Sequence, residues 1–450
     1  MAQALDELFS DRQLKRDTDT LKAWGCDWTR SFSVAPSAVV FVESVEEAVA
    51  LVRLANESGF ALVPSGGRTG LSGGAVAGNG EVVVSFDRMN RILSFDPADR
   101  LVRCQAGVVT ETLQTFAEEQ GLFYPVDFAS AGSSQIGGNI ATNAGGIKVI
   151  RYGMTRDWVA GLKVVTGTGE VIDCNQGLVK NATGYDLRHL FIGSEGTLGL
   201  VVEADMRLAR RPAPQQVMVL GVPLFADILK VLAAFQERLT LSAFEFFSEM
   251  ALTKVLAHRD LARPLADPVP FYALLEFDAP DLEAALAVFE ATLAEGWVTD
   301  GVLSQSEGQA MDLWQLREGI SESIAPYTPY KNDLSVRISQ MPTFIEEVDA
   351  LVAQSYPDFE VCWYGHIGDG NLHLNILKPA GVSQEAFYER CHAISPKIFE
   401  RVQSRQGSIS AEHGVGLLKR DFLSFTRSEA DLAVMHRLKS VFDPNRIMNP

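Results

Sequence analysis

The chain has 450 residues, of which 47% are hydrophobic and 21% are charged. That composition is typical of a folded globular protein, and the length allows two or three domains. The formal net charge is −18, so neither a nucleic-acid partner nor an anionic membrane surface is expected. Any anionic substrate must therefore be bound by individual Arg or Lys side chains.

The five cysteines are widely scattered and form no CxxC pair, which indicates a reducing compartment. The N-terminus has no basic segment followed by an apolar one, and no apolar run approaches the ~18 residues that cross a bilayer. We therefore expect a cytoplasmic protein without a membrane span.

Residues 1–37 are predicted to form a peripheral helical segment. From residue 38 the pattern predicts a strand over 38–42, a helix that opens on a capping box at Ser44 and Glu47, and a strand over 61–63. This strand runs into the loop Pro64–Gly74, which contains five glycines. Bare backbone amides in such a loop can surround a pyrophosphate.

A second glycine-rich stretch covers residues 125–146, where small side chains dominate. A segment of this kind makes a poor core and a poor solvated loop, so a large flat ligand lying against the backbone is the simplest explanation. The alternative is a purely structural glycine-rich crossover, which accounts for one such stretch more easily than for two.

The segment Arg210–Pro214 is a candidate linker. Beyond it, strands near 217–220, 270–277 and 360–365 alternate with amphipathic helices, which predicts an α+β domain with an antiparallel sheet. The sequence predicts four parts: residues 1–37, a first domain over 38–212, a second domain over 213–407, and a segment over 408–450 that returns to the first domain.

Two apolar runs, 361–367 and 372–377, are separated by the turn dipeptide Asp369-Gly370. With that dipeptide at the centre of a hairpin, His366 faces His373. Directly paired residues have Cβ atoms about 4.5–5.5 Å apart, which suits two imidazoles that share one metal ion and require a carboxylate to complete the site. The alternative is that both histidines are simply polar residues on a strand face.

Six blocks, in order along the chain, resemble the FAD-linked D-2-hydroxy acid dehydrogenases of the vanillyl-alcohol oxidase type. They are PSGGRTGLSGG, SSQIGGNIATNAGG, NATGYDLRHLFIGSEGTLG, GHIGDGNLHLN, SAEHGVGLLKR and FDPNRIMNP. The resemblance implies an α+β protein with an FAD-binding domain of two α/β subdomains over 38–212. It also implies an α+β cap domain with an antiparallel sheet that carries most of the substrate site.

By this resemblance, the first glycine-rich loop holds the FAD pyrophosphate and the second lies along the cofactor. Glu195, Gly199 and Val201 contact the adenine end of FAD, and Asn449 lies near the flavin ring. The implied residues are Pro64, Ser65, Gly66, Gly67, Arg68, Thr69, Gly70, Ser130, Gly132, Gly137, Gly138, Asn139, Thr142, Asn143, Gly145, Gly146, Glu195, Gly199, Val201 and Asn449. We expect non-covalent FAD, because Arg68 and Thr69 stand where relatives with covalent flavin often carry a histidine.

The resemblance further implies a divalent metal on His366, His373 and Glu412. Zinc is expected, although manganese and iron accept the same ligands. His413 matches the general base that takes the hydroxyl proton while C2 delivers hydride to flavin N5. Asn375 is in a position to orient the hydroxyl.

Residues 311–324 have a helical pattern, which places Arg317 and Ser321 on one face, and Lys331 follows on the next strand. By resemblance these three bind the distal carboxylate of a diacid, a group best met by a bidentate Arg and a second charge. D-2-hydroxyglutarate is the first expected substrate and D-malate the second. The alternative for Arg317 is a surface salt bridge.

Three other functions compete with oxidation of a diacid. D-lactate or glycolate dehydrogenation would leave Lys331 without a role, a zinc hydrolase would leave the glycine-rich stretches unexplained, and a non-catalytic flavin-binding protein would not need Glu412 and His413. No Rossmann fingerprint is present, so the expected electron acceptor is an electron-transfer flavoprotein or a quinone rather than NAD. A homodimer is common among such enzymes.

Overall fold

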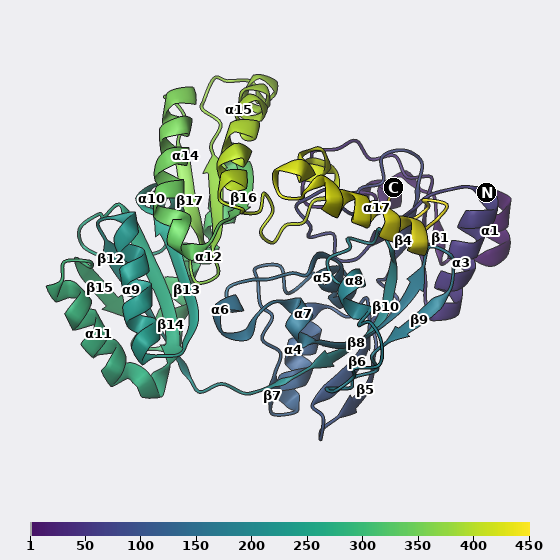
Figure 1. The fold of residues 1–450 in the computed structure, drawn as a ribbon, viewed down its shortest axis with the longest axis horizontal. Coiled ribbons are helices and arrows are strands. Elements are labelled where there is room, and N and C mark those ends of the chain that lie inside the picture. Colours follow the sequence, from purple (N-terminus) through teal and green to yellow (C-terminus); the bar gives the residue numbers. More distant parts are fainter. Residues whose placement is uncertain (1) are drawn as a thin grey trace. The chain divides into compact units, whose positions relative to one another are not determined.

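The computed structural model describes residues 2–450 and separates into two compact units (Figure 1). Unit 1 comprises the chain up to Gly145 together with Gly153–Arg211 and Glu412–Pro450, and unit 2 comprises Gly146–Tyr152 and Pro212–Ala411. Among the described residues, no helix has the length and apolar character needed to cross a membrane.

The first half of unit 1 is a four-stranded sheet in the order β1-β2-β4-β3. Strands β2, β4 and β3 are parallel, and β2 and β4 are buried at every position, as expected when both faces of a parallel sheet are covered. In α3 the cap is Ser44, whose Oγ accepts from Glu47 N at 3.2 Å. The elements are α1 (Ala2–Leu8), β1 (Leu14–Lys15), α2 (Thr18–Trp24), β2 (Ala38–Phe41), α3 (Val45–Ser58), β3 (Leu62–Ser65) and β4 (Val82–Ser85).

The second half of unit 1 is an antiparallel sheet in the order β5-β6-β10-β8-β9. Its elements are β5 (Ile92–Asp96), β6 (Leu101–Gln105), α4 (Thr110–Glu119), β7 (Leu122–Phe123), α5 (Ile136–Thr142), α7 (Thr155–Trp158), β8 (Val159–Thr166), β9 (Val171–Cys174), α8 (Arg188–Phe191), β10 (Gly199–Arg207) and β11 (Ala209–Arg210). The C-terminal α16 (Gly416–Lys419), η4 (Arg420–Phe425) and α17 (Glu429–Phe442) also belong to this unit. Met448 forms a parallel bridge with Leu62, which fixes the chain end beside β3.

Unit 2 is built on a seven-stranded antiparallel sheet in the order β15-β12-β14-β13-β17-β18-β16. The strands are β12 (Gln215–Val222), β13 (Leu241–Ser248), β14 (Phe271–Asp278), β15 (Asp300–Leu303), β16 (Tyr330–Ser335), β17 (Val361–His366) and β18 (Asn371–Ile376). The helices are α6 (Val149–Tyr152), α9 (Phe225–Arg238), α10 (Glu249–His258), η1 (Ala279–Asp281), α11 (Leu282–Ala294), α12 (Glu307–Glu318), α13 (Ile320–Ser323), η2 (Ala325–Tyr327), η3 (Ile338–Gln340), α14 (Met341–Ser355) and α15 (Gln384–Ser404). The α+β class predicted from the sequence is confirmed.

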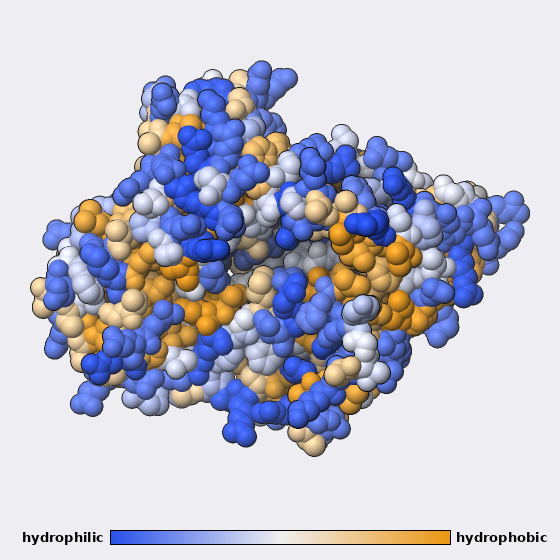
Figure 2. All heavy atoms as spheres, in the orientation of Figure 1, coloured by the Kyte–Doolittle hydropathy of each residue, from blue (hydrophilic) through white to orange (hydrophobic). Residues whose placement is uncertain are grey.

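The two faces of this sheet have different neighbours (Figure 1). On one face Phe246 packs against Phe225 of α9, and Trp363 donates to Asp349 of α14 at 2.5 Å. Hydrophilic residues dominate the outer surface over α14 and α15 (Figure 2). On the other face, apolar residues of β12, β13 and β14 form a core cluster with α10, α12 and α13. Strands β16, β17 and β18 carry polar side chains on this second face, because successive residues of a strand alternate between faces.

Candidate functional site

The two glycine-rich stretches of unit 1 are in direct backbone contact. A Cβ at Gly67 would lie 2.1 Å from the carbonyl oxygen of Ser133, and one at Gly137 would lie 2.7 Å from Ala106 Cβ. These two glycines are therefore required by the packing of the protein itself. Gly138, by contrast, has no atom within 4 Å of the corresponding position, so the backbone there is open to a ligand. The glycines thus divide between those that the internal packing requires and Gly138, whose backbone is left uncovered.

Glu195 connects this region to the C-terminal segment. Its carboxylate accepts hydrogen bonds from Val415 N at 3.0 Å and Gly416 N at 3.1 Å, and from Ser72 Oγ at 3.3 Å. Burial raises the pKa of Glu195, while the hydrogen bonds from Val415 and Gly416 act against that shift. The side chain is therefore an anchor for the chain just after Glu412 and His413.

Asn449 strengthens the same junction. Its Nδ2 donates to the carbonyl oxygens of Gly74 at 2.8 Å and Glu195 at 2.7 Å. Upstream of the junction, His413 Nε2 lies 3.7 Å from Glu412 Oε1. Loops separated by more than 200 residues thus hold the candidate base and the candidate carboxylate ligand in a fixed part of unit 1.

The hairpin of unit 2 differs from the sequence prediction in its register. Four residues, 367–370, connect β17 to β18, so Tyr364 faces His373 and His366 faces Asn371. The prediction that His366 directly faces His373, with Asp369-Gly370 as a two-residue turn, is wrong. The reason lies in the turn itself, where Gly370 has φ +88° and the Oδ1 of Asp369 accepts from Asn371 N at 3.2 Å.

A shift of two residues leaves every side chain on its original face. His366 and His373 are consequently diagonal neighbours, with ring centroids 5.4 Å apart and ring planes at 82°. Both are buried, at 7% and 6% exposure. The expected proximity of the two imidazoles is thus present, although the pairing that produces it is different.

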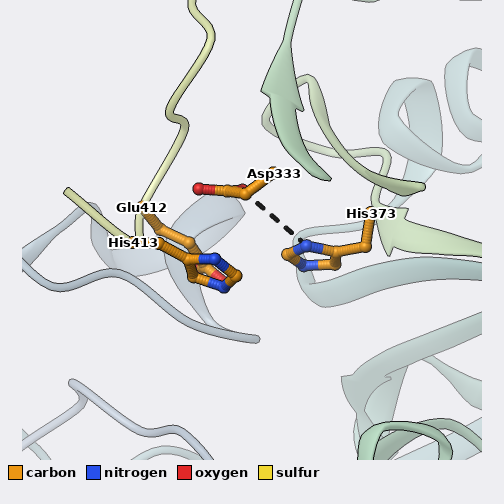
Figure 3. A group of neighbouring side chains, drawn as sticks. All are labelled: Asp333, His373, Glu412 and His413. Carbon is orange, nitrogen blue, oxygen red and sulfur yellow. Dashed lines mark ion pairs between the residues drawn. The ribbon is translucent and has the colours of Figure 1, made fainter. Parts of the chain in front are cut away.

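Each of these imidazoles has a carboxylate at its Nδ1. His366 Nδ1 lies 2.8 Å from Glu245 Oε1, and His373 Nδ1 lies 3.7 Å from Asp333 Oδ1. Figure 3 shows the Asp333–His373 pair of unit 2 and, separately, the Glu412 and His413 side chains of unit 1. The His366 distance is within hydrogen-bonding range, and a carboxylate that accepts from Nδ1 fixes the tautomer that leaves Nε2 as a lone-pair donor. The longer His373–Asp333 distance is that of an ion pair.

Arg317 lies beside this pair of histidines. It is buried, its Nη2 is 2.8 Å from Glu245 Oε2, and its guanidinium lies 4.7 Å from the centre of the Tyr364 ring. Its Nε and Nη2 nevertheless lack an aligned hydrogen-bond partner among residues 2–450. The surface salt bridge that competed with a binding role is excluded, because both members of the ion pair are buried.

The helix predicted over 311–324 is interrupted at Gly319, where α12 ends and α13 begins. Arg317 and Ser321 therefore lie on two successive helices rather than on one face of a single helix. Gly319 N donates to Gln315 O, and a Cβ at Gly319 would lie 2.6 Å from the same carbonyl oxygen. The close approach of the chain at this point favours glycine and a break.

Lys331 is held on the same side of the sheet. Its Nζ donates to Ser321 Oγ at 3.0 Å, and burial lowers the pKa of its ammonium below the usual lysine range. Asn375 faces Lys331 across β16 and β18, and its Oδ1 and Nδ2 are buried without an aligned partner among the described residues. Unpaired buried polar atoms of this kind are unfavourable unless a ligand satisfies them.

The sequence did not single out Glu245 or Asp333. Each faces a histidine across a strand pair, Glu245 with His366 and Asp333 with His373. For Asp333 a signal was present, because it lies two residues after Lys331 and so shares its face. For Glu245 no local signal exists, since it lies 121 residues away from its histidine.

Two protein-family models match this chain. A model of the FAD binding domain matches residues 36–175, and a model of the C-terminal domain of FAD linked oxidases matches residues 211–450. The chain belongs to the FAD-linked oxidase family. The relationship inferred from the six sequence blocks is thereby confirmed.

Members of the FAD-linked oxidase family with known names are similar over nearly the whole chain. D-2-hydroxyglutarate dehydrogenase of Stutzerimonas stutzeri is 60% identical over 99% of this chain and 97% of its own length. The protein of the same name from Xanthomonas citri pv. viticola is 55% identical over 99% of this chain and 95% of its own length. The mitochondrial D-2-hydroxyglutarate dehydrogenase of Bos taurus is 38% identical over 99% of this chain and 82% of its own length. The chain is thus an FAD-dependent oxidoreductase that acts on a CH–OH group.

Solved structures of this fold include more distant flavoproteins. 4-Ethylphenol oxidase from Gulosibacter chungangensis matches with a TM-score of 0.78 and 17% identity, covering 100% of this chain and 96% of its own. p-Cresol methylhydroxylase matches with a TM-score of 0.76 and 16% identity, covering 100% and 95%. At such identities the match concerns the fold alone, and it confirms the vanillyl-alcohol oxidase type of architecture.

Proposed function

We propose that this protein oxidises D-2-hydroxyglutarate to its 2-oxo acid with non-covalent FAD and a divalent metal ion. The observation that carries the proposal is one polar face of the unit 2 sheet, where two buried imidazoles share the face with the buried Arg317 and the half-buried Lys331. Imidazoles suit the metal-bound hydroxy acid end of the substrate, and the cations suit a second carboxylate. The names of the full-length relatives support the same substrate.

In this proposal His366, His373 and Glu412 hold the metal ion, with zinc expected. Bound FAD would supply the hydride acceptor at N5 for hydride from C2, and the bound ion would acidify the 2-hydroxyl group. His413 takes the hydroxyl proton, and Asn375 orients the hydroxyl through its buried side-chain amide.

The distal carboxylate is assigned to Arg317, Ser321 and Lys331. Support comes from Arg317 Nε, which lacks a hydrogen-bond partner among the described residues, and from the burial of Arg317, which strengthens its attraction for an anion. Lys331 is half-buried, and this burial lowers the pKa of its ammonium. D-Malate is a second candidate substrate. D-Lactate and glycolate are disfavoured because they lack the second carboxylate that is assigned to Arg317 and Lys331.

Unit 1 is proposed to bind FAD, and unit 2 to act as the substrate-carrying cap. Support comes from the open backbone at Gly138 and from the match of residues 36–175 to an FAD binding domain. The proposed contacts are Pro64, Ser65, Gly66, Gly67, Arg68, Thr69, Gly70, Ser130, Gly132, Gly137, Gly138, Asn139, Thr142, Asn143, Gly145, Gly146, Glu195, Gly199, Val201 and Asn449. For Glu195 the contact would be made by its backbone, because its carboxylate already binds Val415 and Gly416.

We also propose a cytoplasmic location, supported by five free cysteines. An electron-transfer flavoprotein is the proposed acceptor, with a quinone as the alternative. NAD is not proposed, because the sequence lacks a dinucleotide fingerprint. A homodimer is the proposed assembly, by analogy with related enzymes.

Anaerobic mixing of the flavin-loaded protein with D-2-hydroxyglutarate is expected to bleach the flavin absorption band, whereas the L-enantiomer leaves it unchanged. Removal of metal by a chelator should slow the bleaching by about 100-fold or more, because the ion acidifies the hydroxyl, and added zinc should restore it. Stopped-flow absorbance measures both effects. A band that no D-2-hydroxy acid bleaches would contradict the proposal, as would bleaching that is faster with D-lactate than with the diacid.

The pH dependence of kcat/KM tests the role of Lys331. Because burial lowers its pKa, Lys331 should lose its charge at a lower pH than an ordinary lysine, which titrates near ~10.4. As pH rises through that lowered pKa, kcat/KM for D-2-hydroxyglutarate should fall, and Lys331→Arg should move the fall to higher pH. A monocarboxylic substrate should show no such limb. An identical alkaline limb for both substrates would assign it to another group.

A further inference from the structure

Glu245 is the residue that joins the two halves of the proposed substrate site. It lies on β13, faces His366 across the strand pair, and is 1% exposed. One carboxylate oxygen is 2.8 Å from His366 Nδ1, and the other is 2.8 Å from Arg317 Nη2. A single buried side chain therefore contacts both a candidate metal ligand and the candidate carboxylate-binding cation.

Only a carboxylate serves both partners. The guanidinium of Arg317 can only donate hydrogen bonds, and an imidazole that binds metal through Nε2 carries its proton on Nδ1 and must donate it. Position 245 must therefore accept from His366 with one oxygen and present a negative oxygen to Arg317 with the other, at an ion-pair distance of 2.8 Å without hydrogen-bond alignment. A glutamine there has one acceptor oxygen and one NH2 group. It must lose Arg317 or else donate to His366, and donation to Nδ1 would place the ring proton on Nε2, where it blocks metal binding.

The contacts of Arg317 make its position dependent on this carboxylate. Its guanidinium lies over the Tyr364 ring at 4.7 Å, and its Nε and Nη2 have no aligned hydrogen-bond partner among the described residues. The ion pair with Glu245 is consequently the main polar contact that holds this buried cation while it keeps donors for a ligand.

We propose that Glu245 is a positioning residue that fixes the metal-binding tautomer of His366 and, at the same time, the place of Arg317. It thereby matches the two ends of the site to a hydroxy acid that carries a second carboxylate. This inference rests on the proposed function, since it assumes a metal at His366 and a distal carboxylate at Arg317.

The test compares wild-type protein, Glu245→Gln and the control Glu249→Gln. Glu249 also accepts from an arginine, Arg263, and from Tyr272, but it contacts neither His366 nor Arg317. Zinc affinity is measured by competition with a chromogenic chelator, without substrate. Glu245→Gln should weaken zinc binding by roughly 10–100-fold, the range seen when a carboxylate behind a metal-binding histidine is lost, and Glu249→Gln should leave it unchanged.

The second readout is the ratio of kcat/KM for D-2-hydroxyglutarate to that for D-2-hydroxybutyrate, at saturating zinc. In Glu245→Gln this ratio should fall by ~10-fold or more, because a displaced Arg317 misplaces the diacid alone. If Glu245→Gln does not fold, Glu245→Asp replaces it, since a side chain one methylene shorter keeps the charge but cannot reach both partners. The same two changes are expected.

The outcomes separate the inference from the proposed function. Wild-type protein that binds no zinc and is not reduced by D-2-hydroxyglutarate would refute the proposed function itself. Wild-type protein that does both, with zinc affinity and substrate ratio unchanged or raised in the Glu245 variants, would refute the positioning role of Glu245 alone.

Discussion

Replacement of His373 by alanine is expected to lower kcat/KM for D-2-hydroxyglutarate by roughly a thousand-fold and to abolish stoichiometric zinc binding. The ring is buried beside Asp333 and is 5.4 Å from His366, centroid to centroid, so its loss leaves His366 as the one remaining imidazole of the proposed ligand set. A Lewis acid that stabilises the developing alkoxide contributes several kcal/mol to catalysis, and about 4 kcal/mol corresponds to roughly a thousand-fold in rate.

The measurement combines zinc stoichiometry, flavin content and steady-state turnover. Flavin content should stay at the wild-type level, because all of the proposed FAD contacts except Gly146 belong to unit 1 while His373 belongs to unit 2. His258→Ala is the matched control, since His258 ends α10 and is exposed. A His373→Ala protein that retains wild-type turnover would show that the ion, if present, is bound elsewhere.

Replacement of Arg317 by lysine is expected to lower kcat/KM for D-2-hydroxyglutarate by about 100-fold while D-2-hydroxybutyrate is affected little. Lysine keeps the charge that Glu245 requires, so the fold should survive, but it loses the planar fork and the contact with the Tyr364 ring. A hydrogen bond between charged groups contributes about 1.5–3 kcal/mol, and about 3 kcal/mol corresponds to roughly a hundred-fold.

Arg259→Lys provides the control for this variant. Arg259 contacts Gln315 and the exposed Glu322 beside the same pair of helices, and loss of such an exposed pair should change kcat/KM by less than about five-fold, since it contributes at most about 1 kcal/mol. An equal loss for the diacid and the monoacid in Arg317→Lys would assign Arg317 a role in the common hydroxy acid end. The preference for a second carboxylate would then need another explanation.

His373→Ala and Arg317→Lys should therefore change different properties of the enzyme. Loss of His373 removes zinc and slows all substrates, because every 2-hydroxy acid shares the end that the metal binds. Loss of the Arg317 fork spares zinc binding and changes the choice among substrates. This separation is possible because the two groups lie next to each other but act on opposite ends of one molecule in the proposed function.

Local patterns in the sequence predicted many features of the fold and of the candidate site. The glycine-rich stretches, the hairpin histidines and the cations at 317 and 331 are adjacent to clear turn or strand signals. A period-two pattern fixes the face of each strand residue whatever its register. For that reason His366 and His373 were correctly expected on one face, even though the turn of 367–370 moved the pairing by two residues.

The family, the α+β class and the residue types of the candidate site were thus determined by the sequence alone, because blocks, periodicity and turn chemistry are local properties of the chain. Tertiary structure alone decided the register of the hairpin, the break at Gly319 and the backbone contact that requires Gly67. It alone placed Glu245 between His366 and Arg317. Partners across a sheet are set by the packing of whole strands, and a carboxylate 121 residues from its histidine leaves no local trace of that contact.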